Sequence, residues 1–170
     1  FWSLSPNIAS IASMDADHLD VYGSHDMMKE GFEGFIRKIN EDGVLLIMDP
    51  LQKELSNGLK SELNKKNIRI KSLGIDSGEI QAQEVRVKSG RYVFDYVSQR
   101  YTITDLAMKM PGKHNVENAL VAISIALERG CDPNDIRKAI GSFSGVKRRF
   151  EIFCQTKDLV MIDDYAHHPT

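Results

Sequence analysis

The chain has 170 residues, of which 42% are hydrophobic and 27% are charged, and its net charge is −2. This composition is typical of a globular domain that is large enough to bury a core. It lacks the excess of Lys and Arg that binding to nucleic-acid phosphates requires, and no apolar run approaches the roughly 20 residues that span a bilayer.

Three short apolar runs predict strands of a parallel sheet. They are residues 8–14, 44–48 and 159–162. Their continuous rather than alternating character is typical of strands buried on both faces. Each run is followed directly by an aspartate: Asp15, Asp49 and Asp163. Ligands of open α/β sheets lie outside the carboxyl ends of the strands, so the three acids could line one cleft. An aspartate in this position can equally cap a helix or form a turn, and we favour a helix start at Asp49-Pro50, where leucines follow at four-residue spacing.

Helical periodicity predicts helices that flank this sheet. It covers residues 28–39, 116–127 and 133–143, and Asp132 precedes the last of these as a capping residue. Residues 78–110 instead alternate polar and apolar side chains around Ser89-Gly90, which predicts a small antiparallel hairpin or meander. The expected fold is therefore α/β, a mostly parallel sheet flanked by helices with a small antiparallel β subdomain.

The two ends of the sequence lead us to expect an internal fragment of a longer protein. The chain opens on Phe1-Trp2 rather than on Met, and it stops on residues 161–170, which carry two acids, a tyrosine and two histidines. Cys131 and Cys154 lack the spacing of a metal site, so we expect free thiols in a reducing cytoplasm.

A first polar cluster, residues 14–20, places His18 among acidic side chains directly after the first apolar run. A neutral imidazole there could bind a divalent metal while a carboxylate orients it. A hydrogen-bonded turn is the alternative interpretation.

A second cluster, residues 111–119, combines a Pro-Gly turn with a predicted helix start. Asn115 could cap that helix, and Asn118 lies three residues on, so both amides would project on one side of the first turn. Free N–H groups, Lys113 and two carboxamides suit a nucleotide, although plain helix capping would also explain them.

Two further clusters lie near the end of the chain. Residues 144–150 concentrate three cations that could pair with phosphate or simply face solvent. Residues 163–168 could bind a metal, transfer protons or hold a sugar hydroxyl, or they could form a strand-end turn. We favour functional roles because four of the five histidines fall within the four clusters: His18, His114, His167 and His168.

Four segments, taken together and in order, resemble the bacterial Mur ligases. They are DADHLDVYG (15–23), PGKHNVENA (111–119), GVKRRF (145–150) and DDYAHHPT (163–170). Within this family, the resemblance is strongest to the ligases that join L-alanine to UDP-N-acetylmuramate, because of Tyr22-Gly23 and Tyr165. A murein tripeptide-recycling ligase is the alternative. The resemblance implies a peptidoglycan enzyme of the bacterial cytoplasm that uses ATP and Mg²⁺ and passes through an acyl phosphate. It also implies a three-domain parent, in which residues 1–150 are the later part of the ATP-binding domain, with 78–110 as an insertion, and residues 151–170 begin the C-terminal domain.

The resemblance also implies roles for individual residues. His18 corresponds to a ligand of a second magnesium ion, and Asn115 and Asn118 correspond to contacts of the adenine. Arg149 corresponds to a catalytic arginine at the γ-phosphate, and Asp164 to a ribose contact. Tyr165 and a catalytic His167 would lie near the L-alanine, Lys113 and His114 would line the ATP site, and His168 the substrate site.

One departure from the family limits what the chain can do alone. Mur ligases need a Gly-rich loop that ends in Gly-Lys-Thr or Gly-Lys-Ser, but the only Gly-Lys pair here, Gly112-Lys113, is followed by His114. We therefore expect the isolated chain to be inactive. A parallel sheet without the strand that precedes this loop has an exposed edge, so we also expect the chain to self-associate. The sequence leaves two alternative interpretations of the chain's function. One is a metal-dependent hydrolase that uses His18, His167 and His168, and the other is a non-catalytic nucleotide-binding module.

Overall fold

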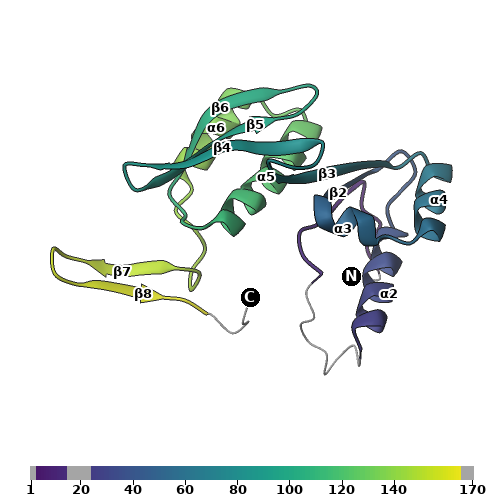
Figure 1. Ribbon diagram of the computed structural model, residues 1–170, viewed down its shortest axis with the longest axis horizontal. Helices are drawn as coiled ribbons and strands as arrows, with labels where there is room; N and C mark the ends of the chain where they lie inside the picture. Colours follow the sequence, from purple (N-terminus) through teal and green to yellow (C-terminus); the bar gives the residue numbers. More distant parts are fainter. Residues whose placement is uncertain (1–2, 15–23, 166–170) are drawn as a thin grey trace.

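A six-stranded mixed sheet forms the centre of the computed structural model, which describes residues 3–14 and 24–165 (Figure 1). The strands lie in chain order: β1 (Ile8–Ile11), β2 (Val44–Met48), β3 (Arg69–Ile75), β4 (Ile80–Lys88), β5 (Arg91–Val97) and β6 (Thr102–Met108). Strands β1 to β4 pair in parallel, and β4, β5 and β6 pair antiparallel. The predicted antiparallel segment is confirmed, and it extends the parallel sheet rather than forming a sheet of its own.

The first two apolar runs are confirmed as strands of the parallel part of the sheet. All five residues of β2 are buried. Leu45 and Ile47 pack with β1 on one face, whereas Val44, Leu46 and Met48 pack on the other. A strand between two cores has no polar face, which explains the unbroken apolar sequence.

Helices cover both faces of the sheet. The helices α2 (His25–Ile36) and α4 (Asn57–Lys65) supply Ile36, Leu59 and Leu63 to one core, and α5 (Lys113–Glu128) supplies Leu120 and Ile123 to the other. Helix α6 (Pro133–Ser142) packs beside β6, and Figure 1 shows it with α5 behind the antiparallel strands. Asp132 caps α6 as predicted, since its carboxylate accepts a hydrogen bond from the Asn134 N–H at 2.8 Å.

The predicted helix after Asp49-Pro50 is interrupted. The short helix α3 (Asp49–Glu54) ends before Leu55, and α4 begins at Asn57. Ser56 caps α4 because its hydroxyl accepts from the Leu59 N–H at 3.2 Å. Leu55 and Leu59, on either side of the interruption, are both buried. The four-residue spacing of leucines therefore continues from one helix to the next and does not show where α3 ends.

Glu33 of α2 connects this helix to the start of α4. Its side chain is nearly buried, and its two oxygens accept hydrogen bonds from the Ser56 N–H and hydroxyl, each at 3.0 Å. Arg37 donates to the same carboxylate at 3.3 Å. The buried charge is thus compensated by three donors, as burial of a carboxylate requires.

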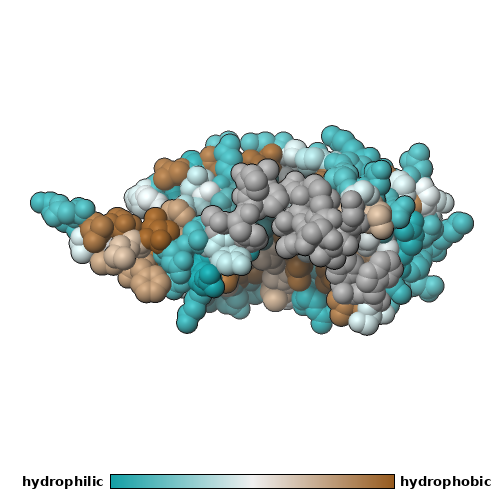
Figure 2. All heavy atoms as spheres, turned by 90° about the horizontal axis from the view of Figure 1, so that it is seen from below, coloured by the Kyte–Doolittle hydropathy of each residue, from teal (hydrophilic) through white to brown (hydrophobic). Residues whose placement is uncertain are grey.

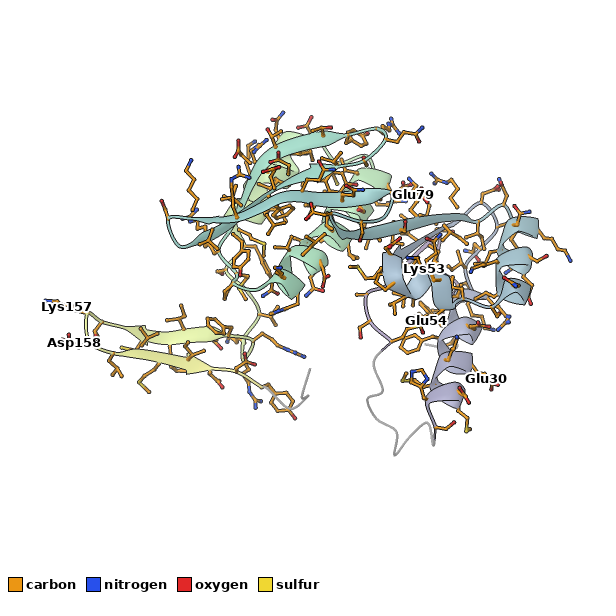
Figure 3. The ribbon with its side chains drawn as sticks, viewed as in Figure 1. Glu30, Lys53, Glu54, Glu79, Lys157 and Asp158 are labelled. Carbon is orange, nitrogen blue, oxygen red and sulfur yellow. The ribbon has the colours of Figure 1, made fainter. Side chains whose placement is uncertain are left out.

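The third apolar run, 159–162, was wrongly predicted as a buried parallel strand. It contributes to β8 (Val160–Asp163), which pairs antiparallel with β7 (Glu151–Gln155) in a separate two-stranded sheet. The hairpin extends away from the six-stranded sheet, with Lys157 and Asp158 at its tip (Figures 1 and 3). Apolar side chains gather on its surface (Figure 2), and Phe153 is 71% exposed. Within the described residues, no helix combines the length and apolar character that crossing a membrane would need.

Candidate functional site

A pocket of about 530 Å³ lies between the start of α5 and the segment that connects α6 to β7. We call it the α5 pocket. Its lining comes from three stretches of chain that are distant in sequence: Met110, Pro111, His114, Asn115, Asn118, Phe143, Gly145, Val146, Arg149, Phe150 and Asp164. A volume of this size falls within the range of about 300–1,000 Å³ that is usual for small-molecule sites.

The first wall is the beginning of α5. The helix starts after Gly112, whose φ of 98° is unfavourable for any residue with a Cβ atom, and a Cβ there would lie 2.5 Å from the His114 ring. The cap has no side-chain hydrogen bond, so the first N–H groups of α5 have no capping side chain. These groups favour a negatively charged or oxygen-rich ligand.

Asn115 does not cap α5, contrary to the sequence-based prediction. The helix begins two residues earlier, so Asn115 lies inside its first turn, where its amide donates to the Pro111 carbonyl at 2.6 Å. This bond fixes the turn before the helix and leaves the amide oxygen without a bond among the described residues. Asn118, about one turn further on, is exposed at the pocket wall.

The opposite wall is the loop between α6 and β7. Gly145 lies at φ 99°, and Arg148 and Phe150 also have positive φ, so the chain turns sharply. The Arg149 N–H closes one turn by donating to the Val146 carbonyl at 3.1 Å. Among the described residues the Arg149 side chain has no ion pair, and its charge remains available to a ligand.

The predicted residues fall into three groups. His114, Asn115, Asn118, Arg149 and Asp164 line the same pocket. Lys113 is exposed and Tyr165 stacks against Arg148, and neither is part of the pocket lining. His18, His167 and His168 lie outside the described residues.

The sequence analysis missed the apolar part of the wall. Met110, Phe143, Val146 and Phe150 line the pocket beside the polar residues, and the last three are exposed. No signal in the sequence marked Phe143, because it continues the apolar periodicity of α6 like a core residue, whereas in the structure the helix ends at Ser142 and Phe143 is exposed. Flat apolar surfaces of this kind suit a planar ring.

The described aspartates of the suggested strand-end cleft do not follow strands of one sheet. Asp163 belongs to the separate hairpin, and Asp49 is a helical residue whose carboxylate lies 3.7 Å from the Lys53 ammonium. Asp15 is outside the described residues. Within residues 3–14 and 24–165, no three His, Cys, Asp or Glu side chains come together as a metal site.

Comparison with known proteins places the chain in a family. Residues 1–126 match the Mur ligase middle domain, and the chain belongs to the Mur ligase family. The chain is 43% identical over 171 residues to the UDP-N-acetylmuramate–L-alanine ligase of Christiangramia forsetii, covering 100% of this chain and 34% of that protein. It is 40% identical to the enzyme of the same name from Flavobacterium psychrophilum, covering 100% of this chain and 35% of the relative. The chain thus spans about a third of the length of these relatives.

Solved structures give the same result for the fold. UDP-N-acetylmuramate–alanine ligase MurC of Thermotoga maritima is 26% identical with a TM-score of 0.76, over 99% of this chain and 36% of that one. The FPGS–AMPPCP complex has a TM-score of 0.78 at 16% identity, over 98% of this chain and 41% of that one. The second likeness concerns the fold alone. The α/β fold implied by the resemblance is confirmed, with six strands in one mixed sheet and a separate pair.

Proposed function

We propose that this chain is part of a ligase that joins L-alanine to UDP-N-acetylmuramate with ATP, and that the α5 pocket binds the ATP. The observation that carries the proposal is the position of Asn118 and Arg149. These two residues, expected at opposite ends of one ATP molecule, line the same pocket although they lie in different elements. The relatives of 43% and 40% identity, both named as L-alanine ligases, support the choice of substrates.

The chemistry of the lining fits ATP. The carboxamides of Asn115 and Asn118 can both donate and accept, which matches the edge of adenine. Phe143 and Val146 offer apolar surface for its ring. The carboxylate of Asp164 can accept hydrogen bonds from ribose hydroxyls, and the Arg149 guanidinium can pair with phosphate oxygens.

His18 is the residue of this chain that we propose as a magnesium ligand. The described residues do not form a metal cluster by themselves. We propose that the His18 imidazole would be one ligand of the second of two Mg²⁺ ions. The ion would offset phosphate charge, while the remaining ligands would come from the nucleotide, water and other parts of the longer protein.

In the reaction that we propose, the muramoyl carboxylate takes the γ-phosphoryl group of ATP, which leaves as ADP, and forms an acyl phosphate. The L-alanine amine then attacks the acyl carbon, and inorganic phosphate and a proton leave as the amide forms. Arg149 would stabilise charge on the transferred group, and Asn115 and Asn118 would fix the nucleotide. Tyr165, His167 and His168 would contact the amino acid or its surroundings, with His167 placed to assist catalysis. His114 would line the ATP site, and Lys113, which is exposed at the start of α5 outside the pocket lining, would lie beside it.

We further propose that residues 1–150 belong to the ATP-binding domain and that residues 151–170 begin the next domain. The pairing of β7 with β8 outside the six-stranded sheet supports this boundary, whereas the family match ends earlier, at residue 126. The sequence has no Gly-Lys-Thr or Gly-Lys-Ser loop, so we propose that the chain alone does not catalyse amide formation.

Binding of nucleotide can be measured on the chain itself. We expect adenosine and ATP to shift the amide NMR signals of the first turn of α5 and of residues 143–150. Replacing Asn118→Ala should weaken adenosine binding by about tenfold, the cost of one to two hydrogen bonds. Asn134→Ala is the matched control, because Asn134 is exposed on α6 and does not line the pocket. Equal affinities of the two variants would overturn the assignment of the pocket.

The amino-acid substrate can be identified only with the longer protein that contains this chain. With ATP, Mg²⁺ and UDP-N-acetylmuramate, we expect phosphate release that depends on L-alanine and not on the murein tripeptide. The reverse preference would identify a tripeptide-recycling ligase instead. The 170-residue chain is expected to release no phosphate under the same conditions.

A further inference from the structure

A second pocket, of about 260 Å³, lies at the other end of α5. We call it the Arg100 pocket. It shares no lining residue with the α5 pocket. Its walls are the first half of β3, Glu79 and Ile80 at the start of β4, the turn between β5 and β6, and the last turn of α5. Figure 3 labels Glu79, directly before β4.

One side of the Arg100 pocket is a fixed ion-pair cluster. Glu128 of α5 accepts a hydrogen bond from Arg69 at 3.0 Å and another from Lys71, both on β3. Burial alone would raise the pKa of Glu128, but the hydrogen bond from Lys71 and the charges of both cations outweigh it and lower the pKa. The carboxylate is therefore ionised at neutral pH and joins α5 to the sheet.

The cations of the pocket outnumber its acids. Arg69, Lys71 and Arg100 line it, together with the two acids Glu79 and Glu128. Arg100 forms no ion pair with any residue in the described part of the chain. Its guanidinium lies 5.2 Å from the ring centroid of Tyr101, which orients it without neutralising it.

The turn that carries Arg100 is held by its own hydrogen bonds. The Ser98 N–H donates to the Tyr101 carbonyl at 2.9 Å, and the Tyr101 N–H donates to the Ser98 hydroxyl at 3.1 Å. The N–H groups of Gln99 and Arg100 have no acceptor among the described residues. A preformed turn with free donors beside a free guanidinium is a suitable site for an oxyanion.

The inner part of the pocket is neutral and partly apolar. Tyr96 lies 3.3 Å through its hydroxyl from the Ser124 hydroxyl, which donates to the Leu120 carbonyl at 2.7 Å. Burial raises the pKa of Tyr96, so its hydroxyl keeps its proton and adds no negative charge. Ile80 and Leu127 add apolar surface next to it.

We propose that the Arg100 pocket binds a small organic anion. Arg100 and the N–H groups of the turn would hold its phosphate or carboxylate group, and Tyr101, Ile80 and Leu127 would contact its carbon skeleton. The volume lies below the roughly 300 Å³ at the lower end of typical ligand sites, which restricts the ligand to a small molecule. This site is independent of the proposed ATP site, because the two pockets have separate walls.

The test is an NMR titration of the chain at constant ionic strength with phenyl phosphate, benzoate and the neutral analogue benzyl alcohol. We expect saturable shifts of the Gln99, Arg100 and Tyr101 amides with at least one of the two anions, and no saturation with benzyl alcohol. Phenyl phosphate and benzoate distinguish a phosphate from a carboxylate preference. Arg100→Ala should weaken the binding by about fivefold, as expected for the loss of one partly exposed ion pair.

Arg91→Ala is the matched control, since Arg91 is an exposed arginine at the start of β5 outside the pocket. It should bind the anions as the unmodified chain does. The proposal is overturned if neither anion gives saturable shifts, if the shifts lie only at the α5 pocket, or if Arg100→Ala binds as tightly as Arg91→Ala. Because Arg100 is exposed, Arg100→Ala should not unfold the chain. The amide spectrum of the variant shows directly whether weaker binding is accompanied by a loss of folding.

Discussion

Arg148 holds Tyr165 at the end of β8. Its guanidinium lies 4.7 Å from the centre of the Tyr165 ring, and its carbonyl accepts a hydrogen bond from the Tyr165 N–H at 2.7 Å. A second bond, from the Arg148 N–H to the Glu151 carboxylate at 2.9 Å, fixes the loop to the start of β7. Because Arg149 and Asp164 are the direct neighbours of this pair, the contact brings both of their side chains to the α5 pocket.

The first prediction removes this contact. Arg148→Ala deletes a cation–π interaction of about 0.5–1 kcal/mol, so the segment after β8 should be held less firmly. We expect faster hydrogen exchange of the Tyr165 amide. The loss of ATP affinity should be about threefold or smaller, because the residues that line the pocket remain. Lys147→Ala is the control, since Lys147 does not line the α5 pocket. Unchanged exchange at Tyr165 would show that the contact does not hold the segment.

The second prediction separates the two ends of the nucleotide. Arg149→Ala should weaken ATP binding by about tenfold or more, the value of a charged hydrogen bond, while adenosine affinity stays within error. Asn118→Ala should weaken both ligands to a similar extent. Isothermal titration of each variant with ATP and adenosine measures the difference. An equal loss of ATP and adenosine affinity in Arg149→Ala would contradict the assignment of this arginine to phosphate.

The polar residues of the α5 pocket could be predicted from sequence because each lies in a short local pattern. Asn115 and Asn118 follow a Pro-Gly turn, and Arg149 lies in a basic loop, so chemistry and spacing were visible without the fold. Their convergence was not visible in the spacing, because it depends on how the α6–β7 loop turns through Gly145 and returns to α5. The apolar wall escaped notice because Phe143 had the periodicity of an ordinary core residue.

The parallel strands were predicted correctly where burial on two faces left an unbroken apolar sequence, as in β2. The same pattern failed at residues 159–162, because an apolar run cannot show which strand is its neighbour. Val160 and Ile162 lie about half exposed in a two-stranded sheet. The cap of α5 was misplaced for a different reason: Gly112 supplies the backbone conformation, and a side-chain cap is absent.

The third prediction concerns the buried carboxylate of Glu33. Glu33→Ala leaves the Ser56 N–H and hydroxyl without their acceptor, and we expect a loss of about 2 kcal/mol in the free energy of unfolding. Urea denaturation followed by circular dichroism measures it. Glu30→Ala is the matched control in the same helix, because Glu30 is exposed (Figure 3) and should change the stability by at most about 0.5 kcal/mol. Equal stability of the two variants would show that Glu33 does not support the start of α4.

The fourth prediction follows from the lowered pKa of Glu128. A carboxyl group whose pKa is lower in the folded than in the unfolded state contributes stability above its unfolded pKa, near the ordinary value of 4.5, and loses it as the pH falls through the folded pKa. Glu128→Gln should therefore be less stable than the unmodified chain at pH 7, and the difference should shrink on acidification below pH 4.5. Urea unfolding at several pH values measures it. A difference that stays constant down to the lowest pH would exclude the ion pairs with Arg69 and Lys71 as its cause.

The fifth prediction is self-association of the chain through the β7–β8 hairpin. The side chains of Ile152, Phe153, Met161 and Ile162 are exposed, and Figure 2 shows the apolar surface that they help to form. Exposed apolar surface on a two-stranded sheet favours association, because a second copy can remove it from water. Sedimentation velocity should show a dimer or larger species that grows with concentration, and Phe153→Ser should shift the distribution toward monomer. Val87→Ser, at a side chain that is 63% exposed on β4, tests whether any exposed apolar residue would have the same effect. A monomer at every concentration would contradict the prediction, and an equal response of both variants would show that the association is not specific to the hairpin.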